Sequence, residues 1–186
     1  YAADPAEDAE KIRINTPLYT AVFSTRGATI HSWGIKPTQP YLQEIEELVR
    51  PRYADRNLVV TMRGNWGLFR TEEKNFQVNK SEIDLREGGQ PDTLKFFLPL
   101  SETAWYSEEY IFYPDKYAVS MSIRSQGLGN LTGAATAMLS WGGGIAQTEI
   151  DSSQDDYYTR SLYLVGKKKE EFKTNGKEVD ERQDLG

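Results

Sequence analysis

Apolar and polar residues alternate along much of this chain with a period of two, which is the spacing of a half-buried β-strand. In the clearest run, residues 117–124, we expect Tyr117, Val119, Met121 and Ile123 to face a core. Other short runs are rich in β-branched and aromatic residues: 18–24, 28–35, 57–63, 75–78, 94–100, 109–113, 134–141 and 157–165. So many short strands predict an all-β protein, an antiparallel β-sandwich with at most one or two short helices.

Turn residues separate these runs. Arg26-Gly27 links the runs 18–24 and 28–35 into a predicted hairpin. Asn175-Gly176 favours a two-residue type I′ turn, because both central residues of that turn need a positive φ. Residues 141–145 hold three consecutive glycines with no helix after them, which predicts a bend or bulge at a sheet edge rather than a phosphate-binding loop.

One segment departs from the β pattern. Leu42, Ile45 and Val49 recur at helical spacing, and Pro40 and Pro51 bound the segment. This pattern predicts a short amphipathic surface helix over residues 42–49.

The composition supports one folded domain. Of the 186 residues, 38% are apolar and 12% aromatic, which is enough to build a core. Residues 1–10 are small and acidic and are expected to form a linker, with a single domain over residues 11–186. Because the chain starts at Tyr1 rather than at a methionine, we expect it to be a piece of a longer polypeptide.

Charge and cysteine content narrow the classes of partner. The formal net charge of −6 disfavours nucleic acid and anionic membrane surfaces. The basic run 167–169 is followed at once by Glu170 and Glu171, so we interpret it as a solvated strand or turn. The absence of cysteine excludes disulfides, thiolate metal sites and a cysteine nucleophile. No stretch approaches the ~20 apolar residues that cross a bilayer.

The sequence offers little catalytic chemistry. Its one histidine, His31, has no Gly-x-Ser-x-Gly motif near it, so we interpret it as a surface or edge-strand residue. Asp151, Asp155 and Asp156 carry the oxygen ligands that calcium prefers, but their spacing does not match an EF-hand loop, and a solvated acidic loop is favoured. Adjacent carboxylates such as Glu108-Glu109 are expected to point to opposite faces of a strand. We therefore predict no enzyme, no cofactor and no metal site.

Consecutive aromatic residues are the remaining signal of binding. Trp105-Tyr106 and Tyr157-Tyr158 each place one ring away from the core if they lie on strands. Outward rings of this kind stack on sugars or clamp a peptide. We take Trp105, Tyr106, Tyr157 and Tyr158 as candidate ligand- or peptide-binding residues, with packing between sheets or under a loop as the alternative.

A hairpin motif within residues 12–30 resembles a known family. The pattern Thr16-x-x-Tyr19-x-Ala21-x-Phe23-Ser24-Thr25-x-Gly27-Ala28 is similar to the start of the periplasmic domain of YidC-type (YidC/Oxa1/Alb3 family) membrane protein insertases. Further along, Pro114-Asp115-Lys116-Tyr117 is similar to the turn of a strand–turn–strand unit in that family.

The resemblance implies a β-supersandwich related to galactose-mutarotase-like domains. It implies a periplasmic location in a Gram-negative bacterium, with helices outside this chain tethering the domain to the inner membrane. The implied role is an accessory, chaperone-like scaffold that assists insertion and folding of inner-membrane proteins. Its implied partners are nascent membrane proteins and Sec translocon accessory subunits. Catalysis is not implied, because the mutarotase reaction needs histidines together with a carboxylate and this chain has one histidine.

Two alternatives stay open. A mutarotase-like, sugar-processing enzyme would share the fold, and a carbohydrate-binding module would use Trp105 or Tyr157. The chain also departs from the family, because it stops at Gly186 shortly after the Asn-Gly turn whereas the family's domain continues. Either the domain is shorter in this protein than in the family, or its final strands are missing from this chain.

Overall fold

A computed structural model of the chain describes residues 9–37, 44–64, 67–128, 136–146, 161–165 and 167–172. The chain divides into two compact units, Tyr1–Thr148 and Glu149–Gly186. The second unit contains a hairpin of β13 (Ser161–Val165) and β14 (Lys168–Phe172), paired antiparallel. That residues 11–186 form a single domain stays a prediction.

The larger sheet of the first unit has eight strands, six of them in the order β12-β5-β3-β2-β1-β8, with β4 paired to β3 and β6 to β5. The strands are β1 (Lys11–Asn15), β2 (Tyr19–Ser24), β3 (Ile30–Ile35), β4 (Glu46–Glu47), β5 (Asn57–Gly64), β6 (Gly67–Arg70), β8 (Glu82–Asp84) and β12 (Thr136–Trp141). The pairing of β1 with β8 is parallel, and the other described pairings in this sheet are antiparallel.

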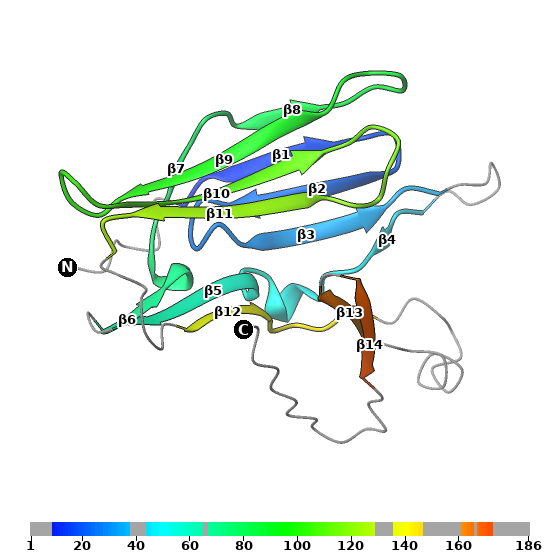
Figure 1. The fold of residues 1–186 in the computed structure, drawn as a ribbon. Helices are drawn as coiled ribbons and strands as arrows, with labels where there is room; N and C mark the ends of the chain where they lie inside the picture. The colour runs from blue at the N-terminus through cyan, green and yellow to red at the C-terminus, as the bar shows by residue number, and fades with distance from the viewer. Residues whose placement is uncertain are drawn as a thin grey trace. The chain divides into compact units, whose positions relative to one another are not determined.

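The smaller sheet has four antiparallel strands in the order β11-β10-β9-β7. They are β7 (Gln77–Val78), β9 (Asp92–Pro99), β10 (Trp105–Phe112) and β11 (Ser120–Gln126). Figure 1 shows this sheet as a layer of its own beside β1, β2 and β3. Two short 3-10 helices, η2 (Pro51–Tyr53) and η3 (Thr71–Glu73), are the helical elements of the described residues. The predicted all-β sandwich is therefore confirmed.

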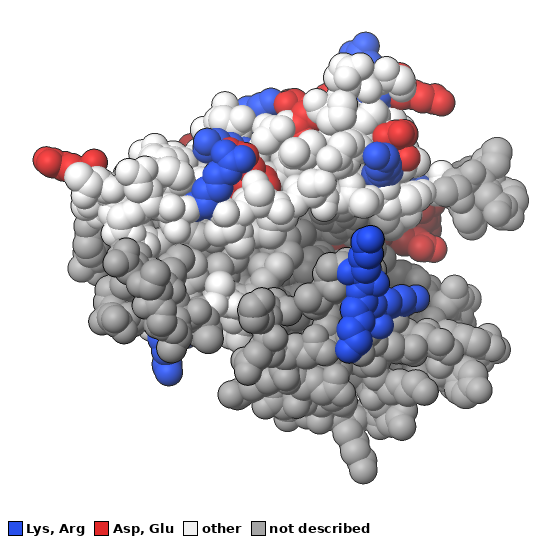
Figure 2. Space-filling model, in the orientation of Figure 1, with Lys and Arg blue, Asp and Glu red and all other residues white. Residues whose placement is uncertain are grey.

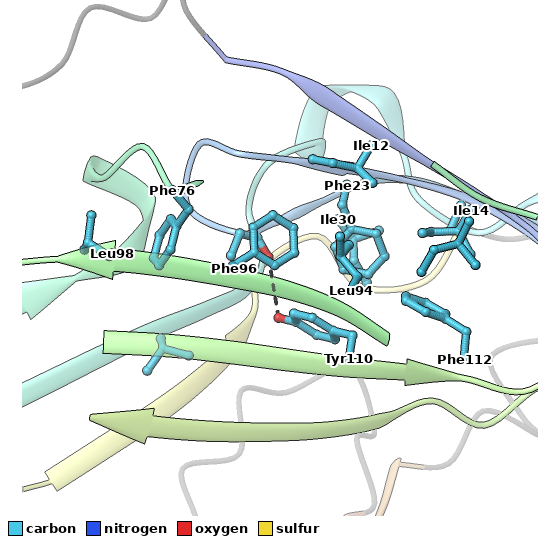
Figure 3. Close-up of a cluster of buried hydrophobic side chains, with 14 of the residues drawn as sticks. Ile12, Ile14, Phe23, Ile30, Phe76, Leu94, Phe96, Leu98, Tyr110 and Phe112 are labelled. Atoms are coloured by element: carbon cyan, nitrogen blue, oxygen red, sulfur yellow. Dashed lines mark hydrogen bonds between the residues drawn. The ribbon is translucent and has the colours of Figure 1, made fainter. Parts of the chain in front are cut away.

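Aromatic rings join the two sheets. The ring of Phe23 in β2 lies 5.0 Å from that of Tyr110 and 5.8 Å from that of Phe112, both in β10. Phe96 in β9 lies 6.0 Å from Phe23 in the same cluster, where Figure 3 shows these side chains converging. Burial of such a ring stabilises a fold by about 1.5–3 kcal/mol. The core therefore follows from the inward positions of strands that alternate with a period of two.

The β2–β3 hairpin forms where the Arg26-Gly27 turn predicts it. Gly27 has a φ of 76°, and a Cβ there would lie 2.8 Å from Cγ2 of Thr29. Both the backbone conformation and the lack of space therefore favour glycine. The other glycine-rich turn, Asn175-Gly176, lies outside the described residues.

The predicted helix over residues 42–49 is wrong for the part that the structure describes, residues 44–49. This segment runs beside β3 and contributes β4. The carboxylate of Glu47 accepts the backbone N–H groups of Trp33 at 2.7 Å and Val49 at 3.0 Å. Hydrogen bonds to a neighbouring strand outweigh a weak local helical pattern.

The predicted inward face of residues 117–124 is only partly buried. β11 begins at Ser120, and Val119 and Met121 are half-buried. Tyr117 and Ile123 are 48% and 41% exposed, so the prediction of core positions is wrong for these two. The alternation is present, but only Val119 and Met121 of the four predicted inward residues are half-buried.

Candidate functional site

The first unit contains an apolar groove of about 430 Å³. Its lining residues come from both sheets and are all apolar or aromatic. They are Phe23, Ile30, Trp33, Ile35, Leu48, Leu58, Tyr110, Tyr117, Val119, Met121, Leu139, Trp141 and Ile145. We call this feature the apolar groove.

The rim of the apolar groove is exposed. Leu139 is 53% exposed, Trp141 41% and Ile145 65%. Single exposed apolar residues are normal on a soluble protein, but a continuous apolar patch marks a surface for a ligand or a protein partner. Deeper in the groove, Trp33 stacks on Tyr19 with ring centres 4.6 Å apart, which fixes its ring as part of the wall.

A β-bulge shapes the side of the apolar groove formed by β5 and β12. Ser140 pairs with Val59 but Trp141 pairs with Asn57, which leaves Leu58 without an opposite residue. Leu58 has a φ of 65°, a left-handed conformation that a bulky residue rarely adopts. The bulge places the Leu58 side chain in the groove at a cost in backbone strain.

The glycine-rich turn after β12 supports the same wall. The N–H of Gly143 donates to Oδ1 of buried Asn57 at 2.9 Å. A Cβ on Gly143 would lie 2.6 Å from Cβ of Tyr53. The bulge next to Trp141 and this turn confirm the prediction of a bend or bulge in residues 141–145.

A buried carboxylate, that of Glu108, is hydrogen-bonded to a residue that lines the apolar groove. Glu108 has no exposed surface, and its Oε1 and Oε2 accept the hydroxyls of Tyr106 at 2.8 Å and Tyr110 at 2.6 Å. Burial raises the pKa of Glu108 to about 7, although the two tyrosine hydrogen bonds lower it. The ring of Tyr110 lines the groove, so one side chain joins the groove to the carboxylate.

The outer face of the smaller sheet carries an ion-paired cluster around Glu109. Glu109, next to Glu108 in sequence, pairs there with Lys95 at 3.1 Å and Arg124 at 3.7 Å. The two adjacent carboxylates therefore point to opposite faces, as predicted. Figure 2 shows basic and acidic side chains beside one another on the described part of the face in view, with uncharged surface between them.

The candidate binding aromatics lie apart from the apolar groove where the structure describes them. Trp105 is half-buried and donates its Nε1–H to Gln126 at 3.0 Å, while Tyr106 is fully buried against Glu108. One ring of this pair faces away from the core, but Tyr106 offers no exposed surface. Tyr157 and Tyr158 lie outside the described residues, so a binding role for these aromatics stays a prediction.

The groove's residues were visible in the sequence as separate apolar runs. What sequence reasoning missed is that they meet, because the lining combines residues of six strands that range from β2 to β12. The one available signal was the clean alternation of residues 117–124, of which Tyr117, Val119 and Met121 line the groove.

His31 takes part in a polar cluster. Its Nδ1 lies 3.1 Å from Oδ1 of Asp55 and 2.9 Å from Nζ of Lys11, and the three side chains are each about two-fifths exposed. Among the described residues, no hydroxyl is hydrogen-bonded to His31, so the cluster lacks the nucleophile of a catalytic triad. The described residues also contain no group of three or more side chains suited to a metal ion. Asp151, Asp155 and Asp156 lie outside them.

Two curated proteins resemble this chain, and both are named membrane protein insertase YidC. The protein from Citrifermentans bemidjiense is 28% identical over 132 residues, which cover 68% of this chain and 24% of that protein. The protein from Syntrophus aciditrophicus is 25% identical over 158 residues, which cover 83% of this chain and 28% of that protein. The chain thus spans about a quarter of the length of the curated relatives it matches.

No protein-family profile and no solved structure matches the chain. Within the described residues, no helix is long and apolar enough to cross a membrane. The two distant relatives cover much of this chain at low identity.

Proposed function

We propose that this chain is a periplasmic accessory domain of an inner-membrane protein insertase of a Gram-negative bacterium. In this role it assists insertion and folding of membrane proteins through protein contacts and catalyses no reaction. The observation that carries the proposal is the similarity to two insertases over most of the chain. Helices outside this chain would tether the domain to the membrane.

The apolar groove supplies a surface that suits this role. A membrane protein that has not yet entered the bilayer exposes long apolar segments, and an apolar groove removes such side chains from water. Nascent membrane proteins are therefore the partners we propose for the groove. Sec translocon accessory subunits are further proposed partners, which the family resemblance suggests.

The location can be tested by cysteine labelling, because the natural chain has no cysteine. Glu102 lies in an exposed turn, so Glu102→Cys places one accessible thiol in this chain, and any cysteine of the parent protein outside the chain is replaced first. We expect a membrane-impermeant maleimide to label this thiol in cells whose outer membrane alone has been made permeable. A cytoplasmic protein with one exposed cysteine is the control. Labelling that requires rupture of the inner membrane would exclude the periplasmic location.

The function can be tested by crosslinking from two matched leucines. Leu139 lines the apolar groove and is 53% exposed, whereas Leu68 lies in β6, is 54% exposed and does not line the groove. A photoreactive amino acid at position 139 should crosslink to membrane proteins during their synthesis, and the same group at position 68 should not. Equal crosslinking at both positions, or none at 139, would contradict a role of the groove in partner binding.

A further inference from the structure

We propose that Glu108 is a proton-binding site within the sandwich, and that loss of its proton removes a hydrogen bond by which Tyr110 joins the two sheets. This inference concerns the fold and does not depend on the proposed insertase function. It begins from the position of Glu108 in the middle of β10, where Tyr106, Glu108 and Tyr110 share the core face and are all buried.

The hydroxyl of Tyr110 has two acceptors within reach. It lies 2.6 Å from Oε2 of Glu108 and 3.5 Å from the backbone oxygen of Ala28. Ala28 lies in the turn between β2 and β3, so the longer contact joins the smaller sheet to the larger one (Figure 3). One hydroxyl carries one proton and cannot donate fully to both acceptors.

The protonation state of Glu108 decides which acceptor receives that proton. When Glu108 is ionised, Tyr106 and Tyr110 both donate to its carboxylate, and Ala28 loses the Tyr110 proton. When Glu108 is protonated, its own O–H can donate to the Tyr110 oxygen, and Tyr110 then donates to Ala28. The neutral form therefore makes one more hydrogen bond, joins the sheets and places no charge in the core.

Among the described residues, the two tyrosines are the side chains that donate hydrogen bonds to Glu108. Its neighbours across the sheet are Phe96 in β9 and Ile123 in β11. From the opposite side, Phe69 and Phe76 pack on the ring of Tyr106, and Phe23 packs on that of Tyr110. Within the described part of the chain, no lysine, arginine or histidine forms an ion pair with Glu108, and no other carboxylate is buried.

The tyrosines keep their protons across the relevant range of pH. Burial, and then the nearby carboxylate, raises the pKa of both Tyr106 and Tyr110 above the ordinary value for tyrosine. Of these three side chains, Glu108 is the one that titrates near neutral pH, because its pKa of about 7 lies above the value of 4.5 expected when the chain is unfolded. The folded state then binds the proton more tightly than the unfolded state between these two values.

The direction of the pH dependence follows from this difference. The stabilisation by the Glu108 proton is complete below about pH 4.5, declines as the pH rises, and is lost above about pH 7. Between these limits, the unfolding equilibrium constant should increase by up to about tenfold per pH unit.

The test is urea unfolding of the 186-residue chain at several pH values from about 5 to 8. We expect Glu108→Gln to abolish the neutral-pH part of the dependence, because an amide does not titrate there. Glu109→Gln is the matched control, since Glu109 is the adjacent carboxylate on the outer face and should leave the dependence unchanged. If the chain and its Glu108→Gln variant respond to pH in parallel, the proposal is wrong.

A second measurement needs no variant and so holds even if Glu108→Gln does not fold. In a chain with 13C-labelled glutamate carboxyl groups, NMR should show one carboxyl that titrates close to pH 7 while the others titrate at lower pH. Tyr106→Phe removes a hydrogen bond that is stronger to the ionised carboxylate than to the neutral acid, and it should move that midpoint upward. Titration of all glutamates in the ordinary range near pH 4 to 5 would overturn the proposal.

Discussion

Leu58 has a backbone conformation that glycine adopts most easily, but its side chain lines the apolar groove. A left-handed residue with a Cβ is less stable by about 1–2 kcal/mol than the same residue in a right-handed conformation. The bulge that requires this conformation lies beside Trp141, another residue of the groove. The residue with the strained backbone is therefore also one of the residues that form the apolar groove.

Two substitutions of Leu58 separate the strain from the side chain. At an ordinary strand position, glycine is less stable than alanine by about 0.5–1 kcal/mol. At position 58 we expect the reverse order, with Leu58→Gly more stable than Leu58→Ala by about 1 kcal/mol, because only alanine retains the strain. Urea unfolding of both variants measures the difference. An alanine variant as stable as the glycine variant would show that the strain is absent.

At the scale of elements, local alternation was sufficient for strands that form hairpins. β2, β3, β5, β9 and β12 lie within a few residues of where the pattern predicts them. β6 and β8 were not predicted, because each is only a few residues long and is defined by its partner strand. The segment 44–49 shows the same limit, since its helical spacing is overridden by pairing with β3.

The start of β10 was missed for a different reason. The predicted strand began at Glu109, but β10 begins at Trp105. Glu108 is a charged residue type at an inward position, which breaks the period-two pattern that identifies strands. The prediction of this strand therefore failed at Glu108, the residue proposed to bind a proton. Such failures are expected where a site places a charged residue type in a hydrophobic core.

Glu47 fixes the segment that replaced the predicted helix. Its carboxylate accepts two backbone N–H groups, those of Trp33 and Val49, and β4 is only two residues long. We expect Glu47→Ala to lower the free energy of unfolding by about 1 kcal/mol, a value reduced by the exposure of the site. Urea unfolding followed by tryptophan fluorescence measures this loss. The neighbouring variant Glu46→Ala is the control and should change stability by less than about 0.5 kcal/mol.

At the scale of the whole chain, the sequence predicted two faces for most strands but not which inward positions are covered. Tyr117 and Ile123 belong to the apolar set of the alternating run 117–124, but they are 48% and 41% exposed. Tyr117 lines the apolar groove, whose lining combines residues far apart in the chain. No pattern within a single strand shows which residues meet there.

Because it contains the apolar groove, we expect the folded chain to bind small apolar molecules. A fluorescent dye that brightens in apolar surroundings should bind with its emission increased, because the groove removes it from water. Leu139→Glu places a carboxylate on the lining and should weaken binding by about tenfold or more, since an apolar ligand would then lie against a charge.

Leu68→Glu introduces the same charge at an equally exposed leucine outside the groove and should leave dye binding unchanged. Both variants should unfold at a urea concentration close to that of the original chain, because neither side chain belongs to the buried core. If Leu68→Glu weakened binding as much as Leu139→Glu, the dye would be reporting general apolar surface. The groove would then not be the binding site of the dye. The crosslinking experiment would still test the proposed insertase role separately.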